Sequence, residues 1–563
     1  MTNKTWTQAS RRGLDAVTTL ACGTVRGTVF GLSTRPQGPA HRSRTCDVVV
    51  VGAGHNGLVA AALLARAGLS VEVWERAAVV GGACRTETPF HRAPRLRAST
   101  GAYLLGLMAP ELLAALDLDL PLVRRDPHYF LPSLDGRYLL LGTDAISARD
   151  QFIRFFTERD WRANEELGAE LAALRDDLAP SWLAEPGTVE ETAERHIRPQ
   201  LRERFLQLVR GSVIDYLSTF GFASEQLVAM YAVTDGMPGL SGSPWRAGSG
   251  HNLLVHNMCR LPGAGGTWMV VRGGMGTVTQ AIARRALAAG ATIRTGVAVE
   301  RIMVDGGIAT GVVSQGGEQV RARVVLVATD PFRLPTLLAD ACPDELRSRI
   351  QGYVERSLGQ TMKVNLALAG LPRFGALPEP RGQHSTTVHL LPEAASDGSV
   401  LTALRTAFAA AGDGRLDPLP PIEWYLHSLL DPSLQDEAGR HSSAFFVQGV
   451  PHTPAGSTWE AEKGRYVGRL LAFAERYAPG LQALVVDVHA LTPPEIESHF
   501  GITHGNIHHV DNAIALAERL PYRVGVDGVY AGAAGCHPAG SVIGCAGYNA
   551  ASAILADLGL RAR

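Results

Sequence analysis

The chain has 563 residues, and its 53 Lys and Arg against 54 Asp and Glu leave a formal net charge of −1. Without excess positive charge there is no field to hold nucleic acid, so we expect no nucleic-acid partner. Hydrophobic residues make up 46% of the chain, which excludes wholesale disorder and is enough for a large core. No apolar run reaches about 18 residues, so we expect no transmembrane helix, while peripheral membrane contact stays open.

The N-terminal segment, residues 1–45, carries seven Lys and Arg but a single acidic residue, Asp15. This composition is typical of a mitochondrial transit peptide, and an unstructured basic tail is the alternative. We expect the mitochondrial matrix for a eukaryotic protein and the cytoplasm for a bacterial one. The cysteine count is odd and no CxxC occurs, so we expect a reducing compartment and no disulfide framework. The seven cysteines are Cys22, Cys46, Cys84, Cys259, Cys342, Cys536 and Cys545.

Next along the chain comes a dinucleotide-binding pattern. Asp47 to Val51 is an uninterrupted apolar run after its first residue, as expected of a buried parallel strand. It leads directly into a G-x-G-x-x-G turn. The elements that follow are a predicted helix over 58–67, a predicted strand over 69–74 and an acidic residue, Glu75. This order predicts a Rossmann-type nucleotide site.

Each residue of the pattern has a physical role. Gly52 permits the tight turn, Gly54 lets a pyrophosphate approach the backbone, and Gly57 lets the helix pack closely on the strand. The helix N-terminus offers free N–H groups to the phosphates. Glu75 accepts hydrogen bonds from ribose hydroxyls and would repel a 2′-phosphate, which disfavours NADP.

Two further glycine-rich features favour FAD over NAD. Gly81 and Gly82 permit a second close backbone approach to the pyrophosphate. Near the C-terminus, a predicted strand ending at Gly532 enters a turn that opens an alanine-rich helix, and we expect Gly532 to contact the cofactor. The residues expected at the start of this helix, with N–H groups toward the flavin ring, are Ser541, Val542 and Ile543. No second G-x-G-x-x-G occurs, so we expect no separate nicotinamide domain.

The run Gly54-His-Asn-Gly-Leu58 resembles the phytoene-desaturase-like branch of the FAD-dependent amine oxidase superfamily. Val271 to Thr277, Leu491 to Pro494 and Cys536 to Pro538 resemble, more narrowly, the pyridine nucleotide-disulfide oxidoreductase domain-containing protein 2 group. The resemblance covers nearly the whole chain from residue 46. It implies non-covalent FAD, with Asn56 in the phosphate turn and Val299 beside the adenine.

The implied fold class is α/β: a Rossmann-type, glutathione-reductase-like FAD lobe with a discontinuous α+β substrate lobe that carries a helical cap. The expected order is a basic tail (1–45), FAD segment 1 (46–105), substrate and cap segment 1 (106–262), FAD segment 2 (263–345), substrate segment 2 (346–505) and FAD segment 3 (506–563). Within the cap we expect helices over 161–178 and 199–216, and within substrate segment 2 a helix over 459–477.

The candidate catalytic residues are His537 and Lys363. His537 precedes the turn expected beside the flavin, and its alternative role is to brace that turn. The resemblance implies that Lys363 reaches the flavin N5 through water, and the alternative is a lysine extending outward from an edge strand. We expect no metal site, because His256, His508, His509 and His537 lack metal-ligand spacing.

Three functions follow from these features. The first is an FAD-dependent dehydrogenase or desaturase that takes hydride from a lipophilic small molecule. The second is an amine or imine oxidase on the same fold. The third is a non-catalytic flavoprotein that regulates a mitochondrion or another organelle. The sequence does not determine the substrate, the electron acceptor or the oligomeric state.

Overall fold

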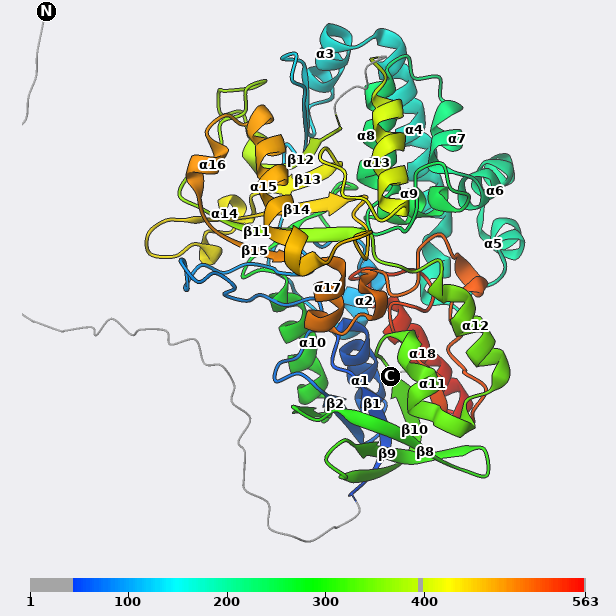
Figure 1. Cartoon of the computed structure of the whole chain (residues 1–563). Helices are drawn as coiled ribbons and strands as arrows, with labels where there is room; N and C mark the ends of the chain where they lie inside the picture. The colour runs from blue at the N-terminus through cyan, green and yellow to red at the C-terminus, as the bar shows by residue number, and fades with distance from the viewer. Residues whose placement is uncertain (1–43, 393–397, 561–563) are drawn as a thin grey trace, which may run out of the picture. The chain divides into compact units, whose positions relative to one another are not determined.

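Two large sheets organise the described part of the chain, residues 44–392 and 398–560 of this computed structural model (Figure 1). Apart from its last two residues, the predicted transit-like tail lies outside the described residues. Within the described ranges, no helix is both long and apolar enough to cross a membrane.

The first sheet has a parallel centre, with strands in the order β7-β2-β1-β10, and an antiparallel extension through β9 and β8. Strand β16 pairs in parallel with the end of β10. The buried valines of β1 confirm the expected parallel strand. The strands are β1 (Arg44–Val51), β2 (Val71–Glu75), β7 (Thr292–Thr295), β8 (Val299–Asp305), β9 (Ile308–Ser314), β10 (Gln319–Val327) and β16 (Val529–Ala531).

Two helices that begin beside this sheet differ from their predicted starts. Helix α1 (His55–Arg66) begins directly after Gly54, three residues before the predicted start. Helix α18 (Cys545–Asp557) begins later than predicted, because Gly544 before it has a left-handed backbone with φ of +82°. A residue in that conformation cannot continue a right-handed helix. Both helices pack against each other, and α1 also packs against α10 (Gly276–Ala288).

The second sheet has the order β15-β11-β14-β13-β12-β4-β5, so β11 is an interior strand. Its strands are antiparallel except for the pair of β4 and β12. The strands are β4 (Tyr129–Pro132), β5 (Tyr138–Leu141), β11 (Thr361–Leu368), β12 (Thr387–Leu390), β13 (Ile422–Tyr425), β14 (His441–Gln448) and β15 (Val485–Leu491).

A group of helices follows β5 in the chain and forms the predicted helical cap (Figure 1, cyan to green). The predicted helix over 161–178 is present. The one predicted over 199–216 is divided, because Gly211 ends one helix and the Ser212 side chain caps the next by accepting from Asp215 N–H. The helices are α3 (Ala145–Phe155), α4 (Glu158–Leu178), α5 (Val189–His196), α6 (Arg202–Arg210), α7 (Val213–Ser218), α8 (Glu225–Tyr231) and α9 (Ser249–His256).

The other described elements connect these parts. Strands of the first sheet come from three separated stretches of chain and alternate with those of the second. The exact segment boundaries stay a prediction. The remaining elements are α2 (Pro110–Leu116), β3 (Leu122–Val123), β6 (Val270–Val271), α11 (Leu334–Leu338), α12 (Asp344–Val354), α13 (Val400–Gly412), α14 (His427–Leu430), α15 (Trp459–Tyr477), α16 (Leu481–Leu484) and α17 (Pro493–Phe500).

Candidate active site

A cavity of about 900 Å³ is lined by residues of both sheets and of the helical cap. We call its two parts the cofactor end, around the glycine turn after β1, and the polar end, against the second sheet. Among the residues predicted from sequence, the structure brings Gly52, Gly54, Asn56, Glu75, Gly81, Gly82, Val299, Lys363, Ser541 and Val542 to the cavity wall.

The glycine turn has the geometry that a bound dinucleotide requires. Gly52 has φ of +104°, which suits glycine. A Cβ added at Gly54 would meet no atom within 4 Å and would extend into the space a phosphate needs. A Cβ at Gly57 would lie 2.2 Å from the Gly52 carbonyl oxygen, so Gly57 lies outside the cavity wall and serves the packing of α1 on β1.

Glu75 is buried at the end of β2 and faces the same turn. Its Oε2 accepts the Ala53 N–H at 2.8 Å, and its Oε1 accepts the Ala77 N–H at 2.8 Å. Each carboxylate oxygen has a further lone pair, so ribose hydroxyls can still donate to it. The two backbone bonds therefore fix the carboxylate in place without using all of its acceptors.

Three arginines that sequence reasoning missed, Arg76, Arg85 and Arg333, also line the cofactor end. Burial lowers the pKa of Arg76, and the charges of Arg333 and Arg85 lower it further. Three neighbouring guanidinium groups are stabilised by a multiply charged anion such as a diphosphate. Together with the open space at Gly54, this donor set fits the diphosphate of FAD.

The C-terminal turn differs in part from its prediction. Ser541 and Val542 line the cavity, but Ile543 does not, and its N–H donates to the Ser541 carbonyl at 3.1 Å. Gly532 also lies off the cavity, where an added Cβ would come within 2.7 Å of Ala550 in α18. Ile543 and Gly532 therefore shape the turn and its packing, and their assignment to direct cofactor contact is corrected.

His537 does not line the cavity. Its buried ring donates from Nε2 to the Ser181 carbonyl oxygen at 2.9 Å, and its own carbonyl accepts the Tyr522 hydroxyl at 2.9 Å. The catalytic interpretation of His537 is therefore corrected in favour of the alternative, in which this residue braces the turn.

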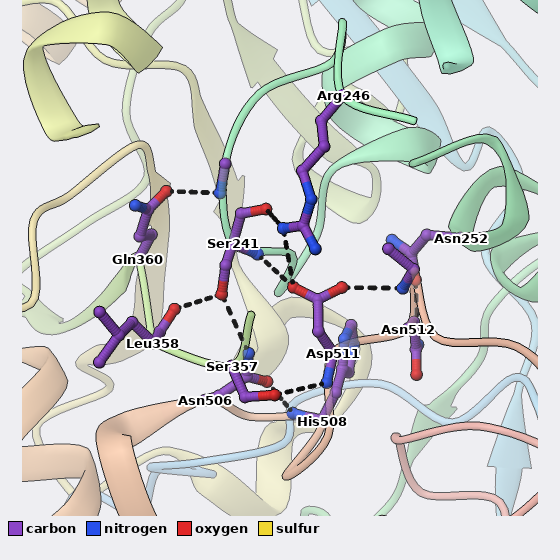
Figure 2. Close-up of polar contacts among 12 residues, drawn as sticks. Ser241, Arg246, Asn252, Ser357, Leu358, Gln360, Asn506, His508, Asp511 and Asn512 are labelled. Carbon is purple, nitrogen blue, oxygen red and sulfur yellow. Dashed lines mark hydrogen bonds and ion pairs between the residues drawn. The ribbon is translucent and has the colours of Figure 1, made fainter. Parts of the chain in front are cut away.

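Figure 2 shows how the segment before this turn is held. The fully buried carboxylate of Asp511 accepts the Ser241 and Ala513 N–H groups, each at 2.8 Å, and pairs with Arg246 at 3.6 Å. Burial raises the pKa of Asp511, and Arg246 opposes that rise. The adjacent Asn512 lines the cavity and accepts the Gly540 N–H at 2.8 Å. This network sets the backbone that presents Ser541 and Val542.

A second buried charge, Arg519, joins the same loops. It is 1% exposed and has no carboxylate partner among the described residues. Burial lowers the pKa of this guanidinium to about 10. Its donors are instead used by oxygens of the surrounding loops. The acceptors are the carbonyls of Val510, Asp511, Ile514, Ala534 and Cys536 and the side chain of Asn512.

The polar end is built by the register of the second sheet. His389 in β12 lies opposite Glu423 in β13, which lies opposite Phe446 in β14, which lies opposite Lys363 in β11. Residues directly opposite in neighbouring strands point to the same face. All four side chains therefore reach one wall of the cavity.

Lys363 is 3% exposed, and its Nζ lies 3.8 Å from the centre of the Tyr103 ring with no hydrogen-bond partner. Burial lowers the pKa of this amine well below its usual range, which favours the neutral form. Strand β11 is interior and the Lys363 side chain faces the cavity, so the edge-strand alternative for Lys363 is wrong.

Glu423 is the buried acid of this wall. Its carboxylate accepts the hydroxyl of Tyr425 and, at 2.8 Å, the Nε2 of Gln448. Burial raises the pKa of Glu423 to about 7, so its charge changes near neutral pH. Sequence reasoning missed this residue, because nothing local distinguishes it from any acid in a strand.

The cysteines of the described ranges form no disulfide. All six that lie in the described ranges are free and buried. Cys84, which lines the cofactor end, donates from its thiol to the Met275 carbonyl at 3.3 Å. Burial raises the pKa of this thiol to about 12. A disulfide-reductase mechanism needs a paired, reactive thiolate, and this arrangement does not supply one.

Comparisons with known proteins agree with this geometry. The family model described as "Flavin containing amine oxidoreductase" matches residues 57–417. The mouse "Pyridine nucleotide-disulfide oxidoreductase domain-containing protein 2" is 36% identical and covers 91% of this chain and 94% of its own. "Hydroxyneurosporene desaturase" of Cereibacter sphaeroides is 28% identical and covers 92% and 99%. The solved structure of an oxidoreductase from Methanosarcina mazei shares the fold, with a TM-score of 0.60, 16% identity and coverage of 91% and 100%.

Proposed function

The chain belongs to the family of flavin-containing amine oxidoreductases, and we propose that it is an FAD-dependent dehydrogenase or desaturase of a lipophilic organic molecule. The observation that carries this proposal is one continuous cavity that joins a dinucleotide-type end to a wall bearing an unpartnered amine, Lys363. Apolar side chains also line this cavity. Those that support a lipophilic substrate are Leu104, Leu107, Met230, Trp268, Phe446 and Ile507.

We infer that the cofactor is FAD held without a covalent bond. The glycine turn, Glu75 and the three arginines would hold its dinucleotide part, and Ser541 and Val542 line the wall beside them. A covalent link through sulfur would require a thiolate. Cys84, the cysteine among the described lining residues, is kept protonated by burial. Acid precipitation should therefore release FAD into the supernatant, and flavin retained in the pellet would contradict this inference.

When bound, FAD supplies the acceptor for the hydride that the substrate loses. The chain must then take up the proton that leaves with it. Lys363 suits this role, because its amine is desolvated, lacks a hydrogen-bond partner and faces the cavity. The surrounding apolar side chains keep water from this amine and so favour its neutral, proton-accepting form.

Replacing Lys363 by Met should slow substrate-dependent bleaching of the flavin by about 100-fold or more, the usual contribution of a general base. Flavin content should not change, because Lys363 lies on the second sheet and not in the glycine turn. Stopped-flow absorbance of the flavin-loaded protein under anaerobic conditions measures this rate. An unchanged bleaching rate would remove Lys363 from the mechanism.

The decisive experiment for the function is a screen for compounds that bleach the flavin without oxygen. Lipophilic unsaturated compounds, primary amines and buffer alone form its three arms. Bleaching by the first class supports the proposal. One observation supports the amine oxidase alternative: Tyr103 and Tyr425 face the cavity with ring centres 4.4 Å apart, and aromatic faces attract ammonium groups. Bleaching by amines alone would favour this alternative. A flavin that no compound bleaches would favour the non-catalytic alternative.

A further inference from the structure

The polar end of the cavity contains a buried cation, Arg125, whose donors are only partly used. Its side chain is 4% exposed and lines the cavity. Its Nε donates to the Trp268 carbonyl at 2.9 Å, and its Nη1 donates to the Thr387 hydroxyl at 2.7 Å. A guanidinium has five N–H donors, so these two bonds leave donors for a ligand. No carboxylate of the described residues lies within ion-pair distance of it.

Arg519 shows what a purely structural arginine looks like in this chain. Both guanidinium groups are buried and lack a carboxylate partner. Arg519, however, donates to six oxygens and lies away from the cavity wall. Arg125 has two acceptors and faces the cavity. The contrast indicates that Arg125 is placed for an acceptor that the chain itself does not provide.

His389 adds a second unused donor beside Arg125. It follows Thr387 by two residues on β12, so both side chains point to the same face. Its ring stacks on Tyr129 at 3.9 Å, and neither ring nitrogen has a hydrogen-bond partner. Burial and the charge of Arg125 lower its pKa, so the ring is neutral and carries one N–H to donate.

The acids near Arg125 are engaged elsewhere. The oxygens of Glu423 accept from Tyr425 and Gln448. Asp235, which also lines the cavity, accepts from His256 Nδ1 at 2.8 Å. Neither carboxylate forms an ion pair with Arg125. The charge of Glu423 acts on Arg125 when Glu423 is ionised, but no carboxylate oxygen uses the remaining guanidinium donors.

We propose that the polar end binds a carboxylate of the substrate, with Arg125 as its anchor and His389 as a second donor. The planar fork of arginine matches the two oxygens of a carboxylate. The apolar walls of the cavity then surround the rest of the molecule, so the substrate class is a lipophilic carboxylic acid. This assignment rests on the proposed function and narrows its substrate.

Three ligands that differ only in their head group test the assignment: octanoate, octanamide and octylamine. Each is titrated into the flavin-loaded protein at pH 6, where Glu423 keeps its proton and octanoate is ionised. Binding is followed by the change in flavin absorbance and by thermal shift. Octanoate should bind more tightly than the other two. Replacing Arg125 by Met should weaken octanoate binding by about tenfold or more, with octanamide binding changed much less. Arg125→Lys should be intermediate, because a lysine keeps the charge but loses the fork.

The neighbouring Arg124 is the matched control, because it does not line the cavity. Arg124→Met should leave octanoate binding unchanged. Flavin content and far-UV circular dichroism show whether each variant is folded. If Arg125→Met does not fold, Arg125→Lys replaces it as the test variant. Equal octanoate binding by wild type and a folded Arg125 variant, or tighter binding of octylamine, would overturn the assignment.

The outcomes separate this assignment from the proposed function. Suppose that uncharged lipophilic compounds bleach the flavin equally well in wild type and Arg125→Met, and that octanoate binds both proteins equally. The proposed function then stands and the carboxylate assignment fails. If octanoate binding depends on Arg125 but no lipophilic compound bleaches the flavin, the binding site stands and the proposed reaction fails.

Discussion

At the residue scale, the absence of one side chain shapes the cofactor end. Nothing lies within 4 Å of the position that a Cβ at Gly54 would take, and that position faces the cavity. A larger residue there would fold without a clash in the protein and would fill the space intended for a phosphate. The site can therefore be blocked without breaking the fold.

Replacing Gly54 by Val should abolish flavin binding, because the branched side chain occupies the phosphate position. The measurement is the flavin-to-protein ratio after purification. Gly352→Val is the matched control, since Gly352 in α12 is also free of neighbours within 4 Å but is exposed and far from the cavity lining. Normal flavin content in a folded Gly54→Val protein would contradict the assignment.

Glu423 should make stability depend on pH. Burial raises its pKa from 4.5 to about 7, so the folded protein keeps a proton that the unfolded chain releases. The stability from this group is present below pH 4.5 and is lost as the pH rises through about 7. Glu423→Gln should lack this loss, on the order of 3 kcal/mol in free energy of unfolding between pH 5 and 8.

Thermal unfolding of wild type and Glu423→Gln at both pH values measures this difference. Glu460→Gln, on the exposed face of α15, controls for removal of an acid in general. Parallel pH profiles for wild type and Glu423→Gln would show that the Glu423 carboxyl does not titrate in this range.

At the element scale, two loops without regular structure carry much of the cofactor wall, and Arg519 joins them. Because its six oxygen acceptors belong to residues 510–514 and 534–536, its removal leaves several buried carbonyls without a donor. The C-terminal turn is thus held by the buried Arg519 side chain as well as by Asn512.

Arg519→Lys should lower the free energy of unfolding by about 3 kcal/mol or more, because a lysine cannot reach so many acceptors at once. Flavin should also dissociate more readily. Arg523→Lys is the control, since its ion pairs with Glu185 and Asp557 are partly exposed and should matter by about 1 kcal/mol or less. Chemical denaturation and flavin release measure both effects. Similar losses for both variants would argue against the special role of Arg519.

At the scale of the whole molecule, neither sheet forms from one stretch of chain. The first sheet needs β16, near the C-terminus, beside β10, and the cavity takes residues from both sheets. Partial unfolding that removes one sheet would therefore also open the flavin site.

Flavin release and loss of secondary structure should consequently occur in one thermal transition. Flavin fluorescence and far-UV circular dichroism measure the two events in the same sample. Added FAD should raise both midpoints together, because it binds the folded form. A flavin-release midpoint well below the circular dichroism midpoint would show that the cofactor end opens on its own.

The sequence by itself determined the features whose cause is local. The strand from Asp47, the three glycines and Glu75 lie within 29 consecutive residues, so their spacing already sets their geometry. Helix α15 was predicted with its observed ends for the same reason, since its apolar positions repeat within one continuous segment. The predicted start of α18 was wrong, because the left-handed backbone of Gly544 depends on the tertiary surroundings of that residue.

Only the tertiary structure decided what stands at the polar end. His389, Glu423, Phe446 and Lys363 come from four strands and meet because the register of the sheet places them opposite one another. Arg125 joins them from a different segment. Register depends on the packing of entire strands, and burial gives Lys363 and Glu423 their shifted pKa values. The sequence carries neither quantity locally, so the glycine turn and Lys363 could be predicted from it, while the other residues of the polar end could not.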